Sequence, residues 1–339
     1  MNLRIVLLLS TLFCFEASAQ KGKKLCISFY NQENLFDTID NPAKNDEEFL
    51  PNGKYRWDHE KYKNKIQNMS KVIGALNENK GPDFMGMCEV ESDYTLHDLS
   101  LKLNQQGLNY KYIWFEGPDE RGIDNALIYK PENVKNVKGV LFTIDPIGIG
   151  GDQTRGILMC DFILSNKARL VIFVNHFPSR REGEKESEFK RIFVAKTLKH
   201  ITDSIEKSDP ACKIMVMGDF NDYPNNISLT DILQAKKEQV SSNSNGFYNP
   251  MYSLMEAGQG SYKHKGEWNF LDQIILNKNL LSEKSNLVYL NNSTAVFKQD
   301  WMLETEEKYK GNPKRTFGGM KYLNGYSDHL PVYLIVEMK

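Results

Sequence analysis

Short apolar runs alternate with segments of helical periodicity along most of this 339-residue chain, and this order restricts the fold more than any other feature. Several runs are rich in β-branched and aromatic residues and lack strict polar–apolar alternation, which predicts strands covered on both faces. Apolar residues recur at three and four positions, as at Tyr62, Ile66 and Met69, which predicts helices over 59–79 and 186–206. The predicted strands are 25–31, 83–91, 125–131, 158–164, 170–177, 213–220, 271–276 and 331–338. Strands and helices that interleave in this way predict a layered α/β fold.

The first residues have the pattern of a secretory signal peptide. Arg4 provides a positive start, an apolar stretch covers 5–15, and the "ASA" motif at 17–19 is typical of a cleavage site. Because the apolar stretch is too short to span a bilayer, we interpret 1–19 as a signal peptide rather than as a retained anchor. A lipoprotein anchor is disfavoured because the residue before Cys14 is bulky. The sequence therefore predicts an exported protein, periplasmic or extracellular.

The remaining chain, 20–339, is predicted to form a single domain, because no Pro/Gly/Ser-rich linker or internal repeat divides it. Its formal net charge of −1 provides no overall field to attract polyanions, so any nucleic-acid binding must depend on local positive charge. No later segment is apolar for long enough to cross a membrane, and we expect a monomer. Buried thiols are favoured over disulfides for the four cysteines after the signal peptide. These are Cys26, Cys88, Cys160 and Cys212.

Acids, amides and histidines stand at the ends of six predicted strands. They are Asn31-Gln32-Glu33, Glu89, Asn175-His176, Asp219-Phe220-Asn221, Asp272 and Ser327-Asp328-His329. Each alone has an ordinary explanation as a solvated strand end or a turn. Asp272 is different, because its apolar neighbours predict burial, and a buried acid needs a partner. The presence of all six groups in one chain favours a shared site. Because they include several carboxylates but no cluster of His or Cys, this site suits a hard cation such as Mg²⁺, with Mn²⁺ or Ca²⁺ as alternatives.

The order of these residues resembles the endonuclease/exonuclease/phosphatase superfamily, which includes deoxyribonuclease I-like enzymes. The motifs "GDFND", "NHFPSR" and "SDHLP" carry the resemblance, which extends from about Leu25 to Val336. The motif "NQENLFDT" further resembles a bacterial branch whose members are commonly exported. The resemblance implies a four-layer α/β/β/α sandwich, in which two mixed β-sheets pack face to face with helices outside.

The resemblance also implies roles for the residues at the strand ends. The implied metal ligands are Glu89, Asn31, Asp328 and Glu33. The implied catalytic residues are Asp219, which orients the attacking water as a base, Asn221, which donates to the phosphate, and His176 and His329, which flank the phosphate. Asp272 is expected to hold His329 in one tautomer and to raise its pKa. We expect direct hydrolysis without a covalent enzyme intermediate.

The substrate is the least constrained part of the prediction. Arg121 and Arg155 lie in segments that resemble family positions near the cleft, and Arg180 follows the His176 motif, so these three are the candidate phosphate-binding residues. Tyr262 and the aromatic segment 245–252 are interpreted as a packed loop, with a stacking platform for bases as the alternative. The leading hypothesis is a secreted, metal-dependent nuclease or, more broadly, a phosphodiesterase. The alternative is a phosphomonoesterase acting on small phosphorylated compounds such as inositol phosphates or nucleotides.

Overall fold

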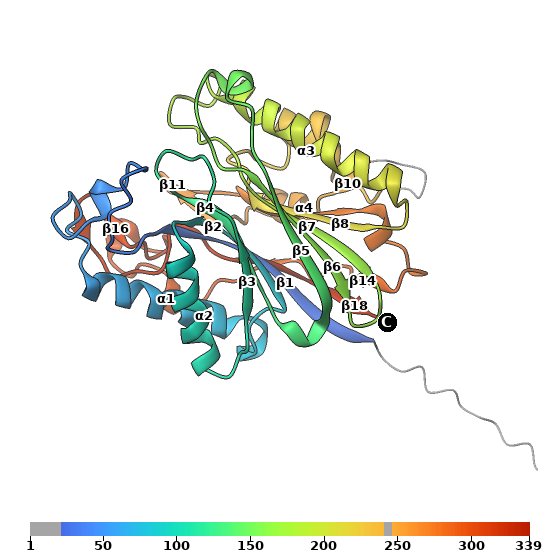
Figure 1. Ribbon diagram of the computed structural model, residues 1–339, viewed down its shortest axis with the longest axis horizontal. Helices are drawn as coiled ribbons and strands as arrows, with labels where there is room; N and C mark the ends of the chain where they lie inside the picture. Colours follow the sequence, from blue (N-terminus) through green and yellow to red (C-terminus); the bar gives the residue numbers. More distant parts are fainter. Residues whose placement is uncertain (1–21, 241–245) are drawn as a thin grey trace, which may run out of the picture.

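The computed structural model describes residues 22–240 and 246–339 (Figure 1). The predicted signal peptide, 1–19, lies outside these residues, so it stays a prediction, as does the single domain over 20–339. Among the described residues, none of the helices combines the length and the apolar character that a membrane span requires.

The first of two large sheets has seven strands in the order β14-β18-β1-β2-β4-β3, with β15 paired to β18. Its strands are β1 (Lys23–Leu35), β2 (Phe84–Val90), β3 (Lys111–Trp114), β4 (Asp124–Tyr129), β14 (Leu287–Tyr289), β15 (Ala295–Val296) and β18 (Val332–Met338). Strand β1 runs parallel to β2 and antiparallel to β18, so the sheet is mixed.

The second sheet also has seven strands, in the order β5-β6-β7-β8-β13-β10-β9. Its strands are β5 (Val134–Phe142), β6 (Ile157–Leu164), β7 (Arg169–His176), β8 (Lys213–Asp219), β9 (Ala235–Lys236), β10 (Phe247–Tyr248) and β13 (Asp272–Asn277). Strand β7 runs parallel to β8, whereas β13 runs antiparallel to β8. Two hairpins stand apart from both sheets, namely β11 (Tyr262–His264) with β12 (Glu267–Asn269), and β16 (Phe317–Gly318) with β17 (Lys321–Tyr322).

The two sheets pack face to face through an apolar layer. In β2, Phe84 and Cys88 belong to this layer, whereas Met85 and Met87 point to the other face of the sheet, as the period of two requires. Gly86 lies opposite the second sheet, where a Cβ atom would come within 2.5 Å of Met217 Sδ. All four cysteines of the described residues are free and buried, as predicted.

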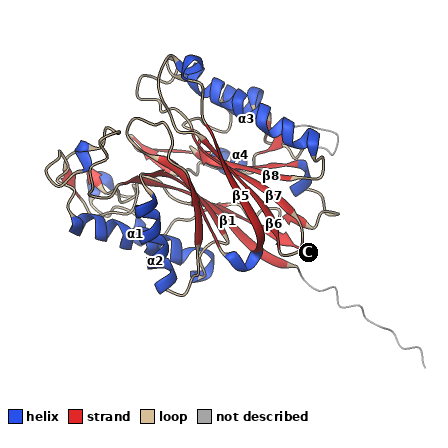
Figure 2. Ribbon diagram, in the orientation of Figure 1, coloured by secondary structure: helices blue, strands red, loops and turns tan. Residues whose placement is uncertain are grey.

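Helices cover the outer faces of both sheets, and this completes the four layers (Figure 2). Helices α1 (His59–Asn79) and α2 (Asp93–Gln105) pack on the first sheet, and α3 (Glu188–Ser208) packs on the second. A short helix, α4, spans Met251–Glu256. Short 3-10 turns cover Glu47–Phe49, Pro131–Asn133, Pro146–Ile149, Lys278–Leu280, Asp300–Met302 and Glu307–Tyr309, and a π turn covers Ser228–Ile232. The predicted four-layer sandwich is confirmed.

Candidate active site

Three neighbouring strands of the second sheet bring His176, Asp219 and Asp272 side by side. In the strand register, Asp219 at the end of β8 is paired with His176 of β7 on one side and with Asp272 of β13 on the other. Gly218 allows the close approach of β7, because a Cβ atom there would lie 2.3 Å from the carbonyl oxygen of Asn175. The "GDF" sequence therefore ends a buried strand with an acid that has a functional group on each side.

The first sheet contributes Asn31 and Glu89 to the same place. The Asn31 side-chain amide donates to Asp219 Oδ2 at 3.1 Å, which joins the two sheets across the site. Glu89 has a left-handed backbone (φ 59°), and its Oε2 accepts the backbone N–H of Asn34 at 2.8 Å. Non-glycine residues rarely adopt this backbone conformation, and such strain is concentrated at functional sites.

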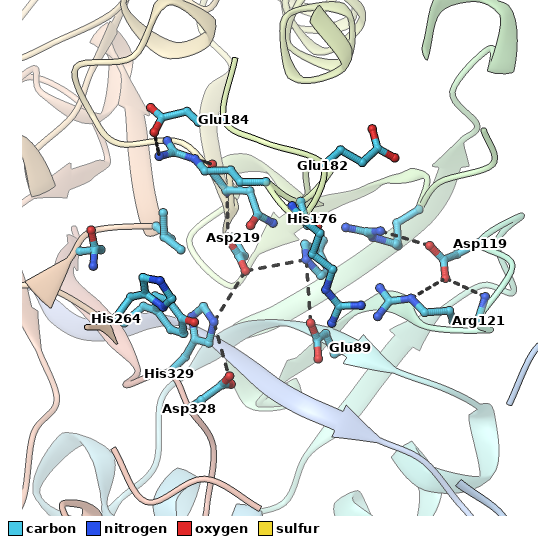
Figure 3. Close-up of a pocket in the computed structure, with 18 of the residues that line it drawn as sticks. Glu89, Asp119, Arg121, His176, Glu182, Glu184, Asp219, His264, Asp328 and His329 are labelled. Atoms are coloured by element: carbon cyan, nitrogen blue, oxygen red, sulfur yellow. Dashed lines mark hydrogen bonds and ion pairs between the residues drawn. The ribbon is translucent and has the colours of Figure 1, made fainter. Parts of the chain in front are cut away.

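Asp219 lies between two histidines (Figure 3). Its Oδ2 is 3.7 Å from His176 Nε2 and 3.9 Å from His329 Nε2. His329 Nδ1 in turn lies 2.7 Å from Oδ2 of Asp272, which is fully buried. The predicted contact between Asp272 and His329 is thus present, and it leaves Nε2 of His329 directed toward Asp219.

The surroundings shift the pKa values of the two histidines in opposite directions. Burial lowers the pKa of His176 well below its usual value, and the guanidinium groups of Arg155 and Arg121 lower it further. Burial alone would also lower the pKa of His329, but the carboxylates of Asp272 and Asp219 raise it well above the usual value. The surroundings therefore favour the neutral form of His176 and the cationic form of His329. Titratable groups whose pKa values are driven apart are typical of catalytic sites.

The predicted metal ligands divide into two groups. Glu89 and Asp328 keep partly exposed carboxylates, with side chains 16% and 20% exposed, and Glu89 Oε1 lies 4.0 Å from His176 Nε2. Asn31 Oδ1 accepts the N–H of Glu33 at 2.9 Å, and an amide oxygen has a second lone pair for a cation. Glu33, in contrast, is 5% exposed, and its Oε2 accepts the N–H of Thr316 at 2.7 Å. Glu89, Asp328 and Asn31 thus offer the oxygen donors that suit a hard divalent cation.

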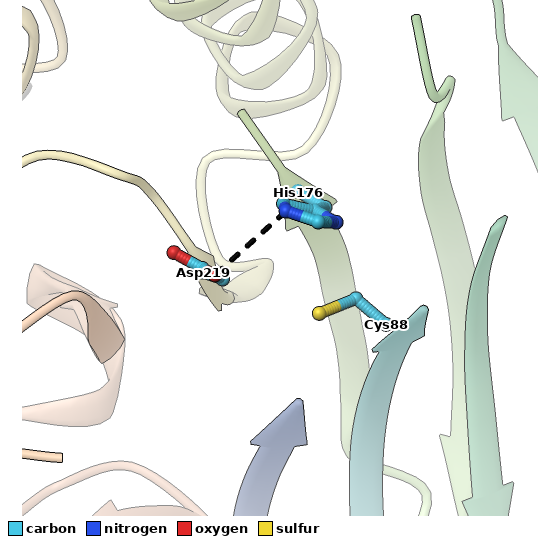
Figure 4. Close-up of side chains that lie close together, drawn as sticks. All are labelled: Cys88, His176 and Asp219. Carbon is cyan, nitrogen blue, oxygen red and sulfur yellow. Dashed lines mark ion pairs between the residues drawn. The ribbon is translucent and has the colours of Figure 1, made fainter. Parts of the chain in front are cut away.

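A second set of possible donors lies beside this one. Cys88, His176 and Asp219 each place one donor atom within 4.8 Å of the others (Figure 4), as do Asp219, Asp272 and His329. Burial raises the pKa of the Cys88 thiol well above its usual value, and only a thiolate binds metal strongly. Cys88 also packs in the layer between the sheets. We therefore interpret Cys88 as a core residue, and Asp219, Asp272 and His329 as groups that transfer or balance protons.

The three predicted phosphate-binding arginines differ in how far their guanidinium groups are already bound by other residues. Arg155 is buried and donates to Asp119 at 3.1 Å and to the carbonyl of Phe177 at 2.9 Å. Arg121 lies farther from Asp119, with Nε 3.8 Å from Oδ1, and its side chain is 36% exposed. Figure 3 places Arg121 on the same side of the site as Glu89 and His176.

Arg180 already has partners for its whole guanidinium group. It donates to Asp222, Asn226 and the carbonyl of Asn221, and its Nη1 lies 3.2 Å from Glu184. Its predicted phosphate contact must therefore compete with these intramolecular contacts. Asn221 is also engaged, because its side-chain amide donates to the carbonyl of Phe177 at 3.0 Å.

A cleft of about 920 Å³ is lined by most of the predicted site residues, namely Glu89, Arg121, Arg155, His176, Arg180, Asp219, Asn221, Asp328 and His329. Sequence reasoning gave no site role to several residues of its wall, which are Asp119, Glu120, Asp152, Gln153, Glu182, Glu184, Tyr223, His264 and Lys265. Most belong to loops and to the β11–β12 hairpin, where no strand periodicity marks them. Tyr262 also lines the cleft, and its ring centroid lies 4.8 Å from that of His329.

Asp124, the first residue of β4, holds the loop that carries Asp119 and Arg121. Its Oδ2 accepts the N–H of Gly117 at 2.9 Å, and its Oδ1 is buried without a partner in the described part of the chain. Burial, and next the charge of Glu116, raise the pKa of Asp124 from its ordinary 3.8 to about 7. The folded protein therefore binds this proton more tightly than the unfolded chain, and stability falls as the pH rises between these two values.

Replacing Asp124 by asparagine is expected to stabilise the protein at alkaline pH. Because the neutral amide removes the cost of a buried charge, the unfolding free energy should rise by about 1 kcal/mol near pH 8 and by less near pH 5. Urea unfolding at both pH values measures the difference. An equal gain at the two pH values would contradict the assignment of a raised pKa to Asp124.

Comparison with known proteins agrees with this geometry. The sequence model of the Endonuclease/Exonuclease/phosphatase family matches residues 26–338. The chain belongs to this family. A search of curated protein sequences finds no match. The family assignment makes the chain a member of a group of phosphoester hydrolases that depend on divalent metals, and it confirms the resemblance to the superfamily. The exported bacterial branch stays a prediction.

Solved structures share the fold at low sequence identity. TDP2 from D. rerio in complex with a single-strand DNA product is 13% identical, with a TM-score of 0.55 over 93% of this chain and 99% of that one. An endonuclease/exonuclease/phosphatase family protein from Bacteroides thetaiotaomicron is 13% identical, with a TM-score of 0.54 over 94% of this chain and 99% of that one. A mannosyl-6-phosphatase from the same organism is 13% identical, with a TM-score of 0.52 over 92% of this chain and 99% of that one.

Proposed function

We propose that this family member hydrolyses phosphoesters by direct attack of water on phosphorus. The position of Asp219 carries the proposal, because this carboxylate lies at the bottom of the cleft between a neutral and a cationic histidine. Burial, and next the charge of Asp272, raise the pKa of Asp219 to about 6. A base with this pKa is ionised at neutral pH and still accepts a proton from water effectively.

Mg²⁺ is the cofactor that we propose, with Glu89 and Asp328 as its carboxylate ligands and Asn31 as an amide ligand. When bound, the cation polarises a phosphoryl oxygen and stabilises negative charge on the leaving oxygen.

The residues of the chain supply the remaining chemistry. Asp219 removes one proton from the attacking water as the oxygen bonds to phosphorus. The bond from phosphorus to the leaving oxygen breaks, and that oxygen takes a proton from solvent. The His329 cation stabilises the charge on the phosphoryl oxygens, while neutral His176 donates a hydrogen bond to them. Arg121 holds the phosphate from the side of the cleft on which Glu89 and His176 lie.

The charge around the cleft favours small phosphorylated compounds over a nucleic-acid strand. Besides Glu89, Asp119, Asp219 and Asp328, four further carboxylates line the cleft, those of Glu120, Asp152, Glu182 and Glu184. Asp152 and Glu182 share one cation, because Lys190 Nζ lies 2.5 Å from the first and 2.7 Å from the second. Nucleic-acid binding usually depends on many phosphate contacts to basic side chains. Five basic residues line the cleft, but two of them, Arg155 and Arg180, are already paired with Asp119 and Asp222.

The nuclease predicted from the sequence stays a prediction. The fold is shared with TDP2, which has been solved with a single-strand DNA product, and with a mannosyl-6-phosphatase, so the fold supports both classes of substrate. The acidic rim is the observation that favours the phosphomonoesterase.

A substrate panel tests the two functions in one experiment. Protein comprising 20–339 is incubated with Mg²⁺ and either plasmid DNA or a set of sugar phosphates, inositol phosphates and nucleotides. We expect release of inorganic phosphate from a monoester, blocked by EDTA, with the plasmid left intact. Nicking of the plasmid without phosphate release would favour the nuclease, and no reaction with any substrate would overturn the proposed hydrolase.

We also propose that the protein is exported, on the basis of the pattern at 1–19. Expression of the full chain with a carboxyl-terminal tag, followed by cell fractionation, tests this proposal. A tagged protein that keeps 1–19 and stays in the cytoplasm would contradict it.

A further inference from the structure

Lys65 of α1 is buried beneath the candidate metal site. It is 1% exposed, and lysine is almost never buried to this extent unless it is paired. Its Nζ donates to Thr316 Oγ1 at 2.8 Å and to the carbonyl of Tyr326 at 2.6 Å. Neither partner is charged, and the carboxylates that attract the ammonium group are those of Glu33, Asp328 and Glu89.

Glu33 lies in the same network, with both carboxylate oxygens engaged. Oε2 accepts the N–H of Thr316 at 2.7 Å, and Oε1 is 3.4 Å from Nε of Arg315. Its backbone is left-handed (φ 48°), so the strand alternation that would place it beside Asn31 ends before it. A metal ligand needs an oxygen directed at the cation, whereas these oxygens are directed at the 315–316 segment.

Arg315 connects this network to Asp328. Its Nη2 donates to Asp328 Oδ2 at 3.0 Å, which leaves Oδ1 on the side of His329, 4.0 Å from Nε2. Ser327 is fixed as well, because its hydroxyl donates to the carbonyl of Asn31 at 2.8 Å. The segment that ends in Asp328 and His329 is thus held by Lys65, Glu33 and Asn31.

We propose that Glu33, Lys65 and Arg315 form a positioning unit for Asp328, and that Glu33 is not itself a metal ligand. Lys65 balances the charge of Glu33, Glu33 orients Arg315, and Arg315 fixes the carboxylate of Asp328. This inference rests on the proposed metal-dependent hydrolysis. Metal binding and thermal unfolding test it without any measurement of catalytic turnover.

Mn²⁺ binding by calorimetry tests the positioning unit. The variants are Glu33→Gln, Arg315→Gln, their combination, and Glu89→Gln as the reference for loss of a ligand. Glutamine at position 33 keeps an oxygen that accepts the Thr316 N–H, removes the charge, and replaces the oxygen that faces Arg315 with an amide NH₂. We expect Glu33→Gln and Arg315→Gln each to weaken Mn²⁺ binding about tenfold, as the loss of a group that orients a ligand does.

Non-additivity distinguishes this unit from a set of independent ligands. Because Glu33 acts through Arg315, the combined variant should bind Mn²⁺ no more than about twofold more weakly than either single variant. Glu89→Gln should bind far more weakly than any of them. A Glu33→Gln defect as large as that of Glu89→Gln, or losses that multiply in the combined variant, would overturn the proposal.

Thermal unfolding tests the part of Lys65. Lys65→Met leaves the buried Glu33 carboxylate with one cation fewer beside it, since Arg315 remains 3.4 Å away, so the melting temperature should fall. Adding Glu33→Gln removes this incompletely balanced charge and should recover at least half of that loss, and no recovery would contradict the pairing. If the wild-type protein binds Mn²⁺ with the expected pattern but cleaves no phosphoester, the positioning unit stands and the proposed hydrolase fails.

Discussion

Replacing Glu89 by glutamine is expected to abolish metal-dependent hydrolysis in a protein that still folds. The side chain keeps its size, and an amide oxygen still accepts the N–H of Asn34 that the carboxylate accepts at 2.8 Å. What is lost is the negative charge that holds the cation. Because the cation stabilises the leaving oxygen, kcat/KM should fall by about 10³-fold or more.

The measurement is the rate with a phosphomonoester and with a phosphodiester over a range of Mg²⁺ concentrations. Glu116→Gln is a matched control, because Glu116 is 47% exposed, is paired with Lys44 and does not line the cleft. Circular dichroism and melting temperature establish that both variants fold. A folded Glu89→Gln protein with wild-type rates would remove the metal assignment of Glu89.

The fold followed from patterns that are local in the chain. Strand β8, predicted over 213–220, spans Lys213–Asp219, and α1 begins and ends where its periodicity predicted, at His59 and Asn79. Strand β5 was not predicted, because its exposed edge carries Lys135 and Lys138 among partly buried residues and so has no continuous apolar run. Helix α2 was also missed, although Leu96, Leu99 and Leu103 recur at helical spacing and Ser92 forms a capping box.

The sequence predicted the site residues that lie at strand ends better than those that lie on loops. His176, Asp219 and Asp272 end or begin adjacent strands, so the sheet brings them together once the strand order is known. Asp119 and Arg181 are brought to the cleft by loops, whose path no periodicity reveals. The position of Glu33 was also predicted wrongly from the sequence. The alternation of side chains along a strand fails there, because β1 adopts a left-handed backbone conformation at Glu33.

Breaking the ion pair between Asp272 and His329 is expected to change the pH dependence of activity. In the wild-type protein the carboxylates of Asp272 and Asp219 raise the pKa of His329, so the cation persists above neutral pH. Asp272→Asn removes the largest of these charges, and burial then lowers the pKa of His329. The variant should therefore lose activity as the pH rises through neutrality, by about 10²-fold near pH 8 and less than about tenfold near pH 6.

His329→Ala removes the cation itself and should lower kcat by about 10²- to 10⁴-fold at both pH values. In the combination of the two substitutions, Asp272→Asn should add little near pH 8, because its effect on His329 is already gone and Asp219 is ionised at that pH with or without the charge of Asp272. NMR titration of the ring of His329 in wild-type and Asp272→Asn proteins measures the pKa directly. An unchanged pKa of His329 in the Asp272→Asn protein, or a pH profile like that of the wild type, would show that the charge of Asp272 does not control this histidine, and the assignment of His329 as the cation beside the phosphate would fail with it.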